Sequence, residues 1–157
     1  MKKALLIVLV PVVLAARGTA SGSSVAGASP DNQLAPATVS AAGTSLGQIL
    51  VDGGGKTLYL FEADKGTQST CFGACAQAWP PLIAVGTPKA AGSASQSLMG
   101  TTLRSDGTRQ ITYAGHPLYS FVGDSKPGDT NGEGSSAFGA GWDVLAPSGA
   151  KIEKADS

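Results

Sequence analysis

The sequence predicts an all-β fold, in which one small antiparallel domain forms a meander, a sandwich or a barrel-like structure from two related halves. Three observations support this prediction. Short segments with alternating apolar residues are separated by turn residues, and helical periodicity is nearly absent. Glycine accounts for 22 of the 157 residues. A segment rich in aromatic residues also occurs twice, with an offset of 60 residues.

The repeated segment covers residues 57–64 and 117–124, and both copies read Leu-Tyr-x-Phe-x-x-Asp. Each copy follows a turn glycine and precedes a tryptophan by about 20 residues. Side chains alternate between the two faces of a strand, so the tyrosine and phenylalanine of each copy should share a face. We expect one common core made from Tyr59, Phe61, Trp79, Tyr119, Phe121 and Trp142.

The two motif aspartates, Asp64 and Asp124, fall just beyond the predicted strands. A short carboxylate at such a place accepts hydrogen bonds from turn amides, which accounts for both residues without catalysis. The alternative is functional, with the paired aromatic residues forming a small ligand-binding cleft between the two halves.

Turn signals divide the rest of the domain into hairpins. They occur at residues 52–55, 105–108, 114–115 and 147–149. The predicted strands cover residues 48–51, 57–62, 101–104, 109–113, 116–122, 142–145 and 151–153. A single helical turn is expected at 74–78, ended by Pro80 and Pro81.

The N-terminal region predicts export. Residues 1–20 have the order of a signal peptide: Lys2 and Lys3, then an apolar run of about 13 residues, too short to span a bilayer, then small residues. Residues 21–44, rich in Ser, Gly, Ala and Pro, are expected to form a disordered, membrane-proximal tether. The folded domain is predicted at 45–153, with repeat halves at about 45–85 and 98–150. No later segment is apolar enough to be a transmembrane helix.

Residues 13–16 are typical of the sequence before the lipidated cysteine of a bacterial lipoprotein, but Arg17 occupies the cysteine position. This argues against a lipid anchor and favours a secreted or periplasmic product of the cell envelope. The chain has 11 basic and 11 acidic residues, and removal of the signal peptide would leave a net charge of about −3. Nucleic acids need a basic face, so they are not expected as partners.

Cys71 and Cys75 are the only cysteines. In an oxidising compartment, two cysteines four residues apart are most simply one disulfide. The alternative is a soft ligand set for copper, or a thiol-redox centre, in which Cys71 and Cys75 act with His116 and with the thioether of Met99.

The two motifs, together with the segments at 71–82, 104–119 and 123–132, resemble the secreted-repeat family of predicted bacterial lipoproteins with a Tyr-x-aromatic-x-x-Asp motif. The resemblance covers essentially the whole predicted domain. It implies export and usually lipid anchoring, and it carries no established activity.

Catalytic signals are sparse in this sequence. The single histidine, His116, precedes a proline, and neither a Gly-x-Ser-x-Gly motif nor a phosphate-binding loop is present. We therefore expect a non-enzymatic binding or scaffolding module for an unknown envelope partner or small ligand, without a resident cofactor. The alternative is the copper-binding or redox accessory protein described above.

Overall fold

The computed structural model describes residues 36–152, which form a small all-β domain, as predicted. The predicted signal peptide and Arg17 lie outside the described residues, as do residues 21–35 of the predicted tether. Nine strands are found in the described part: β1 (Thr38–Thr44), β2 (Gly47–Asp52), β3 (Tyr59–Phe61), β4 (Lys89–Ala90), β5 (Met99–Leu103), β6 (Arg109–Tyr113), β7 (His116–Pro117), β8 (Trp142–Leu145) and β9 (Lys151–Ile152). The helical elements are α1 (Ala74–Ala78), η1 (Gln96–Leu98) and η2 (Ala137–Gly139).

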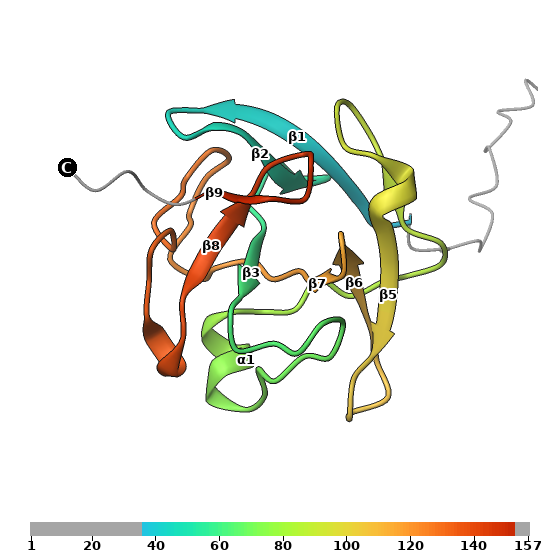
Figure 1. Cartoon of the computed structure of the whole chain (residues 1–157), viewed down its shortest axis with the longest axis vertical. Coiled ribbons are helices and arrows are strands. Elements are labelled where there is room, and N and C mark those ends of the chain that lie inside the picture. The colour runs from blue at the N-terminus through green and yellow to red at the C-terminus, as the bar shows by residue number, and fades with distance from the viewer. Residues whose placement is uncertain (1–35, 153–157) are drawn as a thin grey trace, which may run out of the picture. The chain divides into compact units, whose positions relative to one another are not determined.

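The strands form three small sheets, with the orders β2-β1-β4, β3-β8-β9 and β5-β6-β7. Pairing is antiparallel except between β1 and β4, which run parallel. Isolated bridges join the sheets, and no closed barrel is formed by the described strands. Figure 1 shows β1 and β2 at one end of the domain, α1 at the opposite end, and β3 between them.

The predicted boundary between tether and domain was wrong, because residues 38–44 form β1 rather than disordered chain. This strand pairs with β2 from Val39 opposite Asp52 to Thr44 opposite Gly47. It contains only one large apolar side chain, Val39, which is fully buried. A strand that contributes mainly backbone hydrogen bonds needs few large side chains, so its composition resembles that of a linker.

Most of the predicted turns form, including the hairpins of β5–β6 and β8–β9. In the β6–β7 hairpin, Ala114 and Gly115 both have positive φ, 49° and 84°, as a two-residue turn of this kind requires. The hairpin expected around residues 52–55 is shorter than predicted. Its strands meet only at the bridge between Val51 and Thr57, and the ladders of these segments are formed with other strands, β2 with β1 and β3 with β8.

Two hydrophobic clusters form the interior, and β3 separates them. Tyr59 and Phe61 belong to one cluster, whereas Leu58 and Leu60 belong to the other. All three residues of β3 are buried, which agrees with the prediction of a strand covered on both faces. The second copy of the motif follows the same alternation, with Tyr119 in the first cluster and Leu118 in the second.

Candidate functional site

The two copies of the motif meet at the centre of the domain. Tyr59 and Tyr119 form an antiparallel bridge. The Tyr59 N–H donates to the Tyr119 carbonyl at 2.8 Å, and the Tyr119 N–H donates to the Tyr59 carbonyl at 3.0 Å. The two copies therefore contact each other through reciprocal backbone hydrogen bonds.

Each motif tyrosine also reaches the aspartate of the other copy. The Tyr59 hydroxyl donates to Asp124 Oδ2 at 2.7 Å, and the Tyr119 hydroxyl donates to Asp64 Oδ2 at 2.7 Å. The aspartates also accept the turn amides that were expected, from Thr70 to Asp64 and from Asn131 to Asp124. Each carboxylate therefore accepts hydrogen bonds both from the turn of its own copy and from the tyrosine of the other copy.

The motif phenylalanines and the two tryptophans that follow the motifs form one stacked column. Phe61 stacks on Trp142 with ring centroids 4.1 Å apart, Trp142 on Trp79 at 3.9 Å, and Trp79 on Phe121 at 4.3 Å. Tyr59 meets Trp79 edge-on, and Tyr119 meets Trp142 in the same way. The predicted shared core is therefore present, although Phe121 is only partly buried.

The electrostatics keep both tyrosines protonated. Burial, and then the hydrogen bond to Asp124, raises the pKa of Tyr59 well above its ordinary value of 10.0. Burial is also the main factor that raises the pKa of Tyr119. Because both hydroxyls remain neutral donors to carboxylates, the motif residues make structural bonds rather than present an ionised nucleophile.

The cysteines form the predicted disulfide, with Cα atoms 5.3 Å apart. Cys75 lies in α1, and its carbonyl accepts the backbone N–H of Trp79 at 2.7 Å. The Cys71 carbonyl accepts a hydrogen bond from the buried guanidinium of Arg104 at 2.7 Å. The disulfide therefore holds the turn that positions Trp79.

The copper ligand set proposed from the sequence is not assembled among the described residues. The two sulfurs are bonded to each other in the cluster that contains Trp79. His116 and Met99 lie opposite Tyr113, on the two strands that flank β6. Between residues 36 and 152, no group of three or more His, Cys, Asp and Glu side chains is arranged to hold a metal ion. Spacing along the chain suggested the set, but the fold uses the cysteines in a disulfide.

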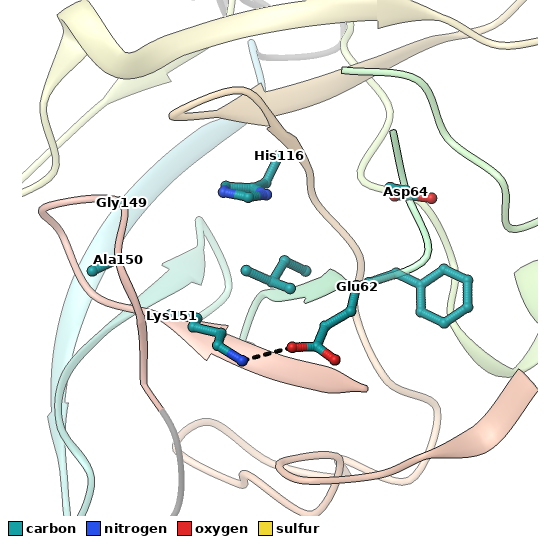
Figure 2. Close-up of a pocket in the computed structure, with 8 residues that line it drawn as sticks. Glu62, Asp64, His116, Gly149, Ala150 and Lys151 are labelled. Atoms are coloured by element: carbon teal, nitrogen blue, oxygen red, sulfur yellow. Dashed lines mark hydrogen bonds and ion pairs between the residues drawn. The ribbon is translucent and has the colours of Figure 1, made fainter. Parts of the chain in front are cut away.

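A cavity of about 340 Å³ lies between the end of β3, the start of β7 and the β8–β9 hairpin. Its lining residues are Leu60, Phe61, Glu62, Asp64, His116, Gly149, Ala150 and Lys151. Figure 2 shows His116, Ala150, Lys151 and Glu62 around one space, with Asp64 to the side of it. The volume is at the lower end of the range for small-molecule sites. Two residues that were singled out from the sequence, Asp64 and His116, are both among the lining residues.

Charged groups line the cavity. Lys151 Nζ lies 2.6 Å from Glu62 Oε1 and 4.0 Å from Asp143 Oδ2. The hydrogen bond and charge of Lys151 lower the pKa of Glu62. Asp64 directs one oxygen to Tyr119 and the other to Thr70. Leu60 supplies an apolar contact to the cavity, whereas the ring of Phe61 belongs to the first cluster and stacks on Trp142.

Sequence reasoning missed Glu62 and Lys151, which are 89 residues apart and meet only in the fold. A comparison of the two copies in the sequence could have indicated the cavity. With the offset of 60 residues, His116 corresponds to Lys56 and Glu62 corresponds to Val122, so the two copies differ at two positions that line the cavity.

Comparison with known proteins gives one match. A family model described as a secreted repeat of unknown function matches residues 40–83 and 100–146, which correspond to the two halves. No curated protein and no solved structure shows a significant match. In the part of the chain that the structure describes, no helix is long and apolar enough to cross a membrane.

Proposed function

We propose that this chain, which belongs to the family of secreted repeats of unknown function, is a cell-envelope module that binds a small ligand and does not act as an enzyme. The binding site is the cavity at the end of β3. The domain is exported, in keeping with the description of its family as secreted.

The proposal rests on the observation that the motif residues and cysteines bond to each other, whereas most of the cavity is lined by other residues. The motif tyrosines and aspartates bind each other across the halves, and the cysteines bind each other. The cavity, in contrast, combines an apolar floor with His116 and the Glu62–Lys151 pair. Binding sites typically have such an apolar wall with a few polar groups that orient the ligand.

The non-enzymatic part of the proposal rests on the same geometry. A general base needs a nucleophile or substrate proton within hydrogen-bond distance. The lining residues include no serine, threonine or cysteine beside His116. The carboxylate of Asp64 already accepts three hydrogen bonds, from Tyr119 and from the backbone and side chain of Thr70.

A fragment screen by two-dimensional NMR tests the proposal. The expected result is that bound fragments shift the resonances of His116, Glu62 and Lys151, and that they are recovered unchanged after long incubation. The variant His116→Ala should weaken binding, whereas Lys56→Ala, its counterpart in the first copy, should not. Shifts confined to other surfaces would overturn the assignment of the site, and conversion of a bound fragment would overturn the non-enzymatic assignment.

A further inference from the structure

We infer that the cavity at the end of β3 selects a small organic cation, namely a primary ammonium or guanidinium group on a short apolar body. This inference rests on the proposed function and adds the chemical class of the ligand.

The first support is the balance of charge around the cavity. Glu62, Asp64 and the neighbouring Asp143 are carboxylates, and Lys151 is the one lysine or arginine among the lining residues. Among these acidic and basic side chains, the carboxylates outnumber the ammonium group. An anionic ligand would add to this excess, whereas a cation reduces it, so charge complementarity favours a cation.

The second support is that these carboxylates already hold an ammonium group. Lys151 Nζ sits 2.6 Å from Glu62 and 4.0 Å from Asp143. The side chains of Lys151 and Glu62 are 38% and 42% exposed, so solvent weakens their pairing and a competing ammonium can replace it. Lys151 therefore acts as an internal occupant of the position that we assign to the ligand.

The third support concerns the remainder of the ligand. Leu60 is almost fully buried and lines the cavity with an aliphatic side chain, whereas the ring of Phe61 stacks on Trp142 in the first cluster. Gly149 and Ala150 line it with little side-chain bulk. A short alkyl chain fits this surface, and its burial adds affinity that an inorganic cation cannot obtain.

Three probes of equal length test the inference: pentylamine, 1-pentanol and pentanoate, titrated into the full chain and followed by the NMR shifts of the cavity residues. Pentylamine should bind about fivefold more tightly than pentanol, and pentanoate should bind least, as one partly exposed charge pair predicts.

The direction in which one variant changes the ligand affinity distinguishes a cationic from an anionic ligand. Lys151→Met removes the internal ammonium, so it should strengthen pentylamine binding, whereas it would weaken binding of an anion. Glu62→Gln should weaken pentylamine binding about fivefold. Asp106→Asn, which makes the same charge change on the exposed β5–β6 turn, should have no effect.

Tighter binding of pentanoate or pentanol at the cavity would overturn the inference and leave the proposed function intact. If no probe and no fragment shifts the cavity residues, both fail.

Discussion

The two copies of the motif can be compared position by position, and they share the residues that join the two halves. The tyrosine, phenylalanine, aspartate and tryptophan are the same in both copies, and all of them contact the opposite half. Outside this shared set, Glu62 is replaced by Val122 and Lys56 by His116.

The comparison separates two kinds of requirement. The shared residues contact each other between the copies and hold the two halves together. A change at one of them would remove a contact from its partner in the other copy. Positions that face solvent have no such partner and can diverge. The cavity is lined by the shared residues Phe61 and Asp64, by divergent positions of both copies and by the β8–β9 hairpin. We assign structure to the shared residues, and we propose that the divergent ones determine what the cavity binds.

The largest expected effect comes from the tryptophan column. Trp79→Ala and Trp142→Ala should each cost about 3–5 kcal/mol in the free energy of unfolding, because each removes three ring contacts. Trp142→Ala should cost about 1 kcal/mol more, since Trp142 Nε1 donates to the Ala137 carbonyl and Trp79 Nε1 has no hydrogen-bond partner among the described residues.

Denaturant unfolding followed by circular dichroism measures both tryptophan variants. Leu103→Ala, at a side chain that is 61% exposed, provides a control within about 0.5 kcal/mol of the parent. A greater loss for Trp79→Ala than for Trp142→Ala would show that the indole hydrogen bond is not what distinguishes the copies.

The next effect tests the crossed tyrosine–aspartate bonds. Tyr59→Phe should cost about 3 kcal/mol, because Asp124 is buried and loses the donor to Oδ2. Tyr119→Phe should cost only about 1 kcal/mol, since Asp64 is half-buried and keeps its bonds from Thr70.

Combining Tyr59→Phe with Asp124→Asn gives a double-mutant cycle for the buried pair. Additive losses would contradict a direct bond, and equal losses for the two single tyrosine variants would remove the predicted asymmetry between the halves.

A third effect concerns the disulfide, which the second copy lacks. Replacing Cys71 and Cys75 together by serine should cost about 2 kcal/mol, the chain-entropy value for so short a loop. The turn also keeps the bond from Arg104 to the Cys71 carbonyl. Fragment binding at the cavity should not change. Loss of binding in a folded double variant would restore a functional role for the thiols.

The smallest effect comes from the surface pair of Lys151 and Glu62. Lys151→Met should change stability at neutral pH by less than about 0.5 kcal/mol, because both side chains are more than one-third exposed. Lys151 lowers the pKa of Glu62 in the folded protein. The pair therefore contributes stability above the unfolded pKa of about 4.3, and this contribution disappears as the pH falls through the folded pKa.

Thermal unfolding of the parent and Lys151→Met between neutral and acidic pH measures this small difference. The two curves should converge at low pH and in high salt. A difference that grows on acidification would contradict the assigned sign.

Several features followed from local pattern alone. The alternation of Tyr59 and Phe61 against Leu58 and Leu60 gave the two-sided burial of β3, and the prolines after Trp79 ended α1 as expected. Export and the enzyme question remain predictions.

Other features depended on partners distant in the chain. The motif spacing could not show that Tyr59 bonds to Asp124 rather than to the aspartate of its own copy, because both are consistent with one strand followed by one turn. Likewise, β1 could not be recognised, since its stability comes from pairing with β2 rather than from its own side chains. The contact between Glu62 and Lys151 also could not be predicted, because the two residues come together only when β9 pairs with β8.

The pairing around the central bridge also limits how this domain can be divided. β3 of the first copy pairs with β8, which begins at the second tryptophan, while Tyr119 of the second copy bridges Pro81 after the first tryptophan. These central pairings join the two copies, although β1 pairs with β2 inside the first copy and β5, β6 and β7 pair inside the second. A fragment ending between the copies would leave β3 and Pro81 without these partners, so we expect a single copy to fold only by pairing with a second molecule.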